Sequence, residues 1–272
     1  MTARSSFLSV LAPVITRFLA LKQALGRGYS GERDSLRQFD AFLFADGASD
    51  VTPEIFARWC CTLHHLRSGV RRGRMRLVRN LCLYRRRTES TCIVPDRKLF
   101  PPPHQYVRPY IFTGNEIARL ISATRKLIVT TSYPLRREAF RLALVLLYTT
   151  GLRRGELLHL TLADYDPRER TLLVRASKFH KSRYLPLSPS GFQEVEKYLR
   201  ARRRRRGPAS PHSPLLWSGS SAARSYAGSS FIRVFRILLR TAAISKADGR
   251  PPRVHDLRHS FAVNAGGCPA AG

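Results

Sequence analysis

The stretch Val254-His255-Asp256-Leu257-Arg258-His259-Ser260-Phe261-Ala262 decides the fold, and it lies near the end of a chain of 272 residues. A loop with two adjacent prolines, residues 246–252, leads into it, and the pattern predicts a final helix. Because His255 and Arg258 are three positions apart, one helical face presents an imidazole and a guanidinium to the same ligand. The pair is therefore a candidate phosphate site.

A second informative stretch, Thr149-Thr150-Gly151-Leu152-Arg153-Arg154-Gly155-Glu156-Leu157, follows an apolar helix predicted over 135–149. A capping-box pattern at 113–116 predicts another helix before it. Further along, two short strands are expected over 171–175 and 184–187, joined by a basic hairpin tip, and helices are expected over 190–204 and 225–240. This half of the chain is predicted to be mainly helical with a small antiparallel sheet.

The N-terminal part predicts four helices, over 7–25, from Ser30 to Gly47, from Pro53 with Thr52 as its cap, and over 72–87. One face of the fourth helix is strongly basic, with Arg72, Arg76 and Arg79, and is expected to contact a polyanion. Five prolines between residues 95 and 110 predict an extended linker. The expected organisation is a helical domain over 1–94, a linker over 95–110 and a second domain over 111–272.

The charge of the chain points to a polyanionic partner. Its 48 Lys and Arg against 18 Asp and Glu give a net charge of +30. Such an excess favours nucleic acid, with an anionic membrane surface as the alternative. No run of about 18 apolar residues is present, so no membrane span is expected. The five cysteines lack the paired spacing of a zinc site, so we expect no metal and reduced thiols in a cytoplasmic protein. With nucleic acid as the partner, the protein is expected to be associated with the nucleoid.

The two stretches together resemble the tyrosine recombinases, also called the phage integrase family. Residues 149–157 are similar to the family's T-G-L-R-x-x-E-L box, and residues 255–262 to its H-x-L-R-H-S/T-F-A box. The resemblance implies a SAM-like, helical core-binding bundle followed by a mixed α+β catalytic domain with the DNA-breaking-rejoining fold. It also implies double-stranded DNA as substrate, assembly of several copies on DNA, and a reaction without ATP or metal. The domain over 1–94 is then expected to be a DNA-clamping domain that contacts DNA through Arg72, Arg76 and Arg79.

The resemblance also assigns roles to individual residues. Arg153 and Arg258 match the two catalytic arginines that clamp the nonbridging phosphate oxygens. His255 matches the histidine that hydrogen-bonds and transfers a proton. Lys178 matches the lysine that protonates the departing 5′ oxygen, although a simple phosphate contact remains an alternative. Glu156 is expected to orient Arg153. Lys181 lies on the same hairpin tip as Lys178; it is the less favoured candidate for the catalytic lysine and is expected to contact DNA.

The nucleophile of the family has no counterpart in these 272 residues. All ten tyrosines precede His255, and the stretch after Asn264 is rich in glycine. We expect a C-terminally truncated chain, through a frameshift, a premature stop or an annotation error, which is unable to cut DNA alone. Apolar surface over residues 142–147 and at Phe261 is then expected to be exposed.

Three functions compete at this point. The first is an integrase of a mobile element that cuts through a 3′-phosphotyrosyl intermediate. The second is a non-catalytic protein that occupies recombination sites and interferes with full-length relatives. The third, a basic structural or RNA-binding protein, requires both boxes to arise by chance.

Overall fold

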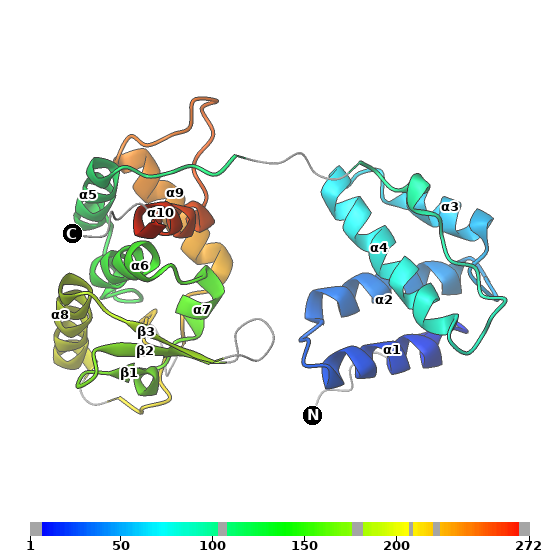
Figure 1. Cartoon of the computed structure of the whole chain (residues 1–272), viewed down its shortest axis with the longest axis horizontal. Helices are drawn as coiled ribbons and strands as arrows, with labels where there is room; N and C mark the ends of the chain where they lie inside the picture. The colour runs from blue at the N-terminus through cyan, green and yellow to red at the C-terminus, as the bar shows by residue number, and fades with distance from the viewer. Residues whose placement is uncertain (1–6, 103–107, 176–181, 207–208, 220–223, 267–272) are drawn as a thin grey trace. The chain divides into compact units, whose positions relative to one another are not determined.

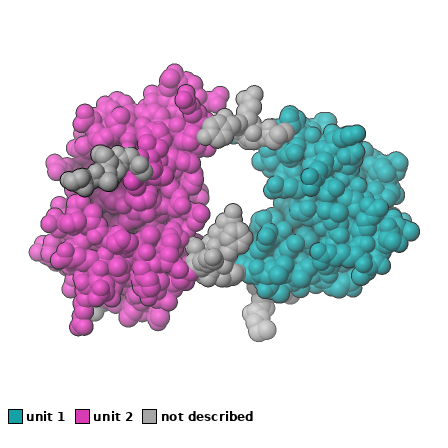
Figure 2. All heavy atoms as spheres, viewed as in Figure 1, with its two compact units in different colours: residues 1–107 teal, residues 108–272 magenta. Residues whose placement is uncertain are grey.

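The computed structural model describes residues 7–102, 108–175, 182–206, 209–219 and 224–266. The chain divides into two compact units, Met1–Val107 and Arg108–Gly272 (Figures 1 and 2). Each unit has its own hydrophobic core. The described residues are mainly helical, with one antiparallel sheet of three short strands. The predicted fold class is therefore confirmed.

The first unit is built from four helices, α1 (Ala12–Ala24), α2 (Ser30–Ala45), α3 (Pro53–Thr62) and α4 (Ser68–Arg85). Their apolar faces meet in one core, where Phe39 and Trp59 pack edge to face at 4.8 Å between ring centroids. As predicted, Thr52 caps α3 by accepting a hydrogen bond from the amide of Ile55.

The first helix begins later than expected, at Ala12 instead of residue 7. The amides of Leu8 and Ser9 donate to the carboxylate of Asp40 on α2, at 2.6 and 3.1 Å. Pro13 then occupies the first turn, where its missing amide hydrogen costs nothing. A buried acid therefore fixes the start of the chain in a non-helical conformation.

The segment that follows α4 packs back onto the first unit. Phe100 is buried against Phe56, with 6.4 Å between the ring centroids, and Arg97–Leu99 form a short 3-10 helix. On α4, Arg79 donates to the carbonyl of Pro95 at 3.0 Å, and Arg72 donates to the carbonyl of Pro101. Residues 95–101, which we call the strap, are thus held by contacts that proline composition alone does not reveal.

The second unit surrounds the central helix α6 (Arg136–Thr150) with α5 (Gly114–Ala123), α7 (Arg154–His159), α8 (Pro189–Arg206), α9 (Gly228–Thr241) and α10 (Val254–Gly266). The strands are β1 (Tyr165–Asp166), β2 (Thr171–Val174) and β3 (Arg183–Pro186), in the order β1-β2-β3. In Figure 1, α10 lies beside α6. The register pairs Val174 with Arg183 and Leu172 with Leu185.

The expected exposure of residues 142–147 is wrong. All six side chains are buried, because α8 and α10 both pack against α6. Phe261 is half-buried against Gly151 at the end of the same helix. The described part of the second unit therefore encloses its own core.

Candidate active site

The start of α10 is fixed by a buried carboxylate. Asp256 is fully buried and accepts hydrogen bonds from the amide of Arg253 at 2.7 Å and from its guanidinium at 2.9 Å. The ammonium of Lys246 lies 3.9 Å away. An acid in the first turn of a helix also interacts favourably with the helix dipole. These contacts set the position of the neighbouring His255 and of Arg258 one turn later.

A serine connects α10 to the segment that enters the second unit. The amide of Phe112 donates to the hydroxyl of Ser260 at 2.9 Å, and this hydroxyl donates to the carbonyl of Asp256, also at 2.9 Å. Ser260 is fully buried, so losing either hydrogen bond leaves an unsatisfied polar group. The helix that carries His255 and Arg258 is thereby attached to residues almost 150 positions earlier.

Gly151 brings the two sequence boxes together. Its backbone is left-handed, with φ of +62°, and a Cβ there would lie only 2.4 Å from the ring of Phe261 on α10. Only glycine allows both this conformation and this close approach. The carbonyl of Gly151 accepts a hydrogen bond from the guanidinium of Arg258. Arg258 and Arg153 therefore belong to one site.

One carboxylate holds two arginines beside Arg258. Glu156 on α7 accepts hydrogen bonds from the amide and the Nη1 of Arg153, at 2.9 and 2.8 Å. Both terminal nitrogens of Arg183, at the start of β3, donate to the same carboxylate at 3.2 and 2.8 Å. The structure thus places Glu156 against Arg153, and it adds a third guanidinium.

The cluster contains more positive than negative charge, with three guanidinium groups and one carboxylate. Burial alone would raise the pKa of Glu156, but hydrogen bonds from Arg183 and Arg153 outweigh this effect and lower its pKa to about 2. Burial, followed by the charges of Arg153 and Arg183, lowers the pKa of Arg258. Arginine nevertheless stays protonated in proteins. One anion among three cations leaves an excess of positive charge, which suits an anionic ligand.

His255 has surroundings that favour its neutral form. Partial burial and then the positive charges of His259, Arg258 and Arg253 lower its pKa from the ordinary value of 6.5. The rings of His255 and His259 meet edge to face, 4.8 Å apart between centroids. At neutral pH the imidazole of His255 is therefore able to accept a proton.

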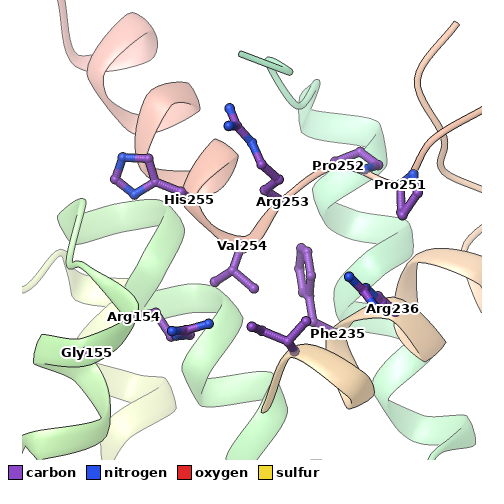
Figure 3. A pocket seen from close by; sticks show the side chains of 10 residues that line it. Arg154, Gly155, Phe235, Arg236, Pro251, Pro252, Arg253, Val254 and His255 are labelled. Carbon is purple, nitrogen blue, oxygen red and sulfur yellow. The ribbon is translucent and has the colours of Figure 1, made fainter. Parts of the chain in front are cut away.

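A pocket of about 420 Å³ adjoins His255. Its walls come from the first turn of α7, from α9 and from the loop that enters α10. Figure 3 shows apolar Phe235 and Val254 flanked by the guanidinium groups of Arg154 and Arg236. Apolar and cationic side chains thus line one pocket beside His255.

The structure places the other sequence-predicted residues as follows. Lys178 and Lys181 lie outside the described residues. Of the arginines expected to contact DNA, Arg76 is exposed, whereas Arg72 and Arg79 donate to strap carbonyls.

Sequence reasoning missed Arg183. A signal for it exists, because residues of alternating parity on a strand face opposite sides of the sheet. Arg183 shares its face with Leu185 and pairs with Val174, which is buried. A charged residue at an inward strand position requires a partner, and Glu156 provides it.

The described residues provide no group of three or more His, Cys, Asp and Glu side chains that could hold a metal ion. Their four cysteines are free. Within the same ranges, none of the helices is long and apolar enough to cross a membrane.

The geometry defines a class of protein with an arginine–histidine cluster in a mainly helical unit. Comparison with known proteins identifies its family. Residues 111–265 match the Phage integrase family. The putative integrase/recombinase y4rB of Sinorhizobium fredii is 30% identical over 94% of this chain and 82% of its own length.

Solved structures show the same fold at low sequence identity. The Tn1549 transposon integrase superimposes with a TM-score of 0.62 at 15% identity, over 94% of this chain and 88% of that one. The lambda integrase gives 0.59 at 16% identity, over 94% and 85%. On the family match and on the relative from Sinorhizobium, the chain belongs to the phage integrase family, the tyrosine recombinases.

Proposed function

We propose that this protein binds double-stranded DNA and activates one phosphodiester for site-specific recombination. The observation that carries the proposal is the hydrogen bond from Arg258 to the carbonyl of Gly151, which joins the two boxes in one cationic cluster. The net charge of +30 supports DNA as the partner. The structures of the Tn1549 and lambda integrases, which share the fold, contain DNA.

In the proposed chemistry, Arg153 and Arg258 bind the nonbridging oxygens of the target phosphate. An attacking oxygen forms a bond to phosphorus while the bond to the leaving oxygen breaks, and the extra negative charge falls on the atoms that the arginines hold. Neutral His255 takes the proton of an attacking hydroxyl. Lys178 is proposed to protonate a departing 5′ oxygen. No ATP and no metal enters these steps.

We further propose that a polypeptide of these 272 residues does not form a covalent intermediate by itself. Several tyrosines of the second unit already have structural roles: Tyr198 accepts from the amide of Trp217, Tyr165 donates to Glu196, and Tyr226 is buried against Phe140. Such a polypeptide would bind recombination sites, alone or with relatives that provide a tyrosine. The first unit is proposed to clamp the DNA, with several copies assembling on one site.

A nicked duplex tests phosphate activation without the protein's own nucleophile. At the nick, the 3′ end carries a p-nitrophenyl phosphodiester and faces the 5′-hydroxyl of the next strand. The base pairs on both sides of the nick are randomised, because the DNA site is not specified in advance. The 5′ oxygen attacks phosphorus, p-nitrophenolate leaves, and the strands are joined. Because p-nitrophenolate leaves without protonation, the reaction does not require Lys178. Sequencing of the joined strands identifies the flanking sequences that react most often. Duplexes with these sequences are then used to measure the rate of p-nitrophenolate release by absorbance.

We expect joining well above the rate without protein. Bound DNA with no acceleration at any sequence would contradict phosphate activation and favour the non-catalytic alternative. A nicked suicide substrate, resolved on a denaturing gel, tests the nucleophile separately. We expect no covalent protein–DNA band, and such a band would overturn that part of the proposal.

A further inference from the structure

Arg183 occupies both oxygens of the Glu156 carboxylate. Its Nη1 donates to Oε1 at 3.2 Å and its Nη2 donates to Oε2 at 2.8 Å. This two-pronged geometry is the strongest way for an arginine to bind a carboxylate. The side chain of Glu156 is only 11% exposed, so water competes weakly for the same oxygens.

The guanidinium of Arg153 consequently makes only one hydrogen bond to this carboxylate. A single guanidinium nitrogen, Nη1, donates to Oε1 at 2.8 Å. Among the described residues, no hydrogen bond engages the Nε or the Nη2 of Arg153. The side chain is 43% exposed, so these donors are available to a ligand.

We propose that Arg183 is a positioning residue that keeps Arg153 available for the phosphate by occupying the carboxylate edge that Arg153 would otherwise take. The inference rests on the proposed function, because it concerns the arginine assigned to the phosphate. Arg183 acts through Glu156 and need not touch the DNA.

The reason lies in the short distance along the chain between Arg153 and Glu156. The two residues are three positions apart, and the amide of Arg153 is already fixed to Oε2. Without Arg183, the guanidinium of Arg153 can rotate onto both oxygens and form the two-pronged pair itself. Two of its nitrogens are then engaged by the carboxylate instead of one, and a second donor is lost to the phosphate. Removal of Arg183 also removes one of the cations near Arg258.

The alternative is a purely structural tie between β3 and α7. The two roles predict different reaction rates for a variant that lacks both Arg183 and the charge of Glu156. Glutamine at position 156 keeps an oxygen for the Arg153 amide but binds a guanidinium far more weakly than a carboxylate. The positioning role therefore predicts that Glu156→Gln rescues a chain that lacks Arg183. A structural tie predicts further damage.

The test measures p-nitrophenolate release and DNA dissociation constants for wild type, Arg183→Met, and Arg183→Met combined with Glu156→Gln. Methionine keeps a long apolar stem and removes the charge. We expect Arg183→Met to slow release at saturating DNA about 10- to 100-fold, with little change in affinity. The double variant should recover at least about tenfold of that loss.

Arg141→Met is the matched control. Arg141 on α6 makes an equally two-pronged pair with Glu194 on α8, at 2.7 and 2.6 Å, away from the cluster. Its loss should leave the release rate within about twofold. If Arg183→Met does not fold, Arg183→Lys replaces it, because lysine keeps the charge but cannot bind both oxygens as a fork.

The outcomes separate the two proposals. A wild-type chain that binds DNA without releasing p-nitrophenolate refutes the proposed function. An active wild type with an unimpaired Arg183→Met, or a double variant no faster than the single one, refutes the positioning role. Failure of both position-183 variants to fold would show a structural tie and would refute it as well.

Discussion

At the scale of single residues, the protonation of His255 is the property most open to measurement. Its pKa is lowered by partial burial and by the charges of His259, Arg258 and Arg253. A base acts in its neutral form, so its activity is complete above the pKa and falls as protonation sets in. Because the shift is downward, this fall lies below the ordinary histidine range.

We therefore predict that joining of the p-nitrophenyl duplex is independent of pH above about 6.5 and declines on the acid side with a midpoint below that value. His255→Gln should lower the plateau about 100-fold or more and remove the decline. The measurement is the release rate at saturating DNA between about pH 5 and 8. A rate that increases toward acid pH would mean that His255 does not act as a base.

At the scale of elements, capping residues and apolar periodicity predicted most of the helices. Thr52 and the Thr113–Glu116 capping box place the starts of α3 and α5 because their polar side chains satisfy the first amides. The six-residue α7 escaped prediction, since so short a helix shows no periodicity. Arg183 escaped because its partner Glu156 is 27 positions away and meets it only through tertiary packing.

The contact between Gly151 and Phe261 predicts a large effect of one methyl group. Gly151→Ala places a Cβ 2.4 Å from the ring of Phe261 in a left-handed backbone, and should destabilise the second unit by about 2–4 kcal/mol. Gly155→Ala is the matched control, because its Cβ meets nothing within 4 Å inside a helix. It should be neutral or stabilising by up to about 1 kcal/mol.

Urea unfolding measures both variants in a Trp59→Phe background, so that Trp217 alone reports the second unit. Equal midpoints for Gly151→Ala and Gly155→Ala would show that the close approach of α10 to α6 is not as the structure has it.

At the scale of the whole molecule, the first unit combines a basic helix with a strap that uses part of the same charge. Arg72 and Arg79 on α4 are half-buried and donate to the carbonyls of Pro101 and Pro95. Arg76 is exposed between them. The sequence could not show which of these arginines is free for DNA and which are bound to the strap. All three have helical spacing on α4, and the partners of Arg72 and Arg79 are carbonyls of a proline-rich segment.

This division predicts different results for three similar substitutions. Arg76→Ala should weaken DNA binding and reduce the slope of log affinity against log salt by about 1. Arg72→Ala and Arg79→Ala should change the slope less and should speed hydrogen exchange at the amides of Leu99 and Phe100 in the strap. Equal salt slopes for all three variants, with unchanged exchange, would contradict the assigned contacts.

The central claim is that Arg153 and Arg258 form one phosphate-activating site. Its most direct test compares p-nitrophenolate release at saturating DNA for wild type and Arg258→Lys, with the DNA dissociation constant measured on the same duplex. Lysine keeps the charge but cannot donate as a fork. We predict a loss of about 100- to 1,000-fold in release with a change in affinity below about threefold. Equal release by both proteins, or losses of release and affinity in the same proportion, would contradict the claim.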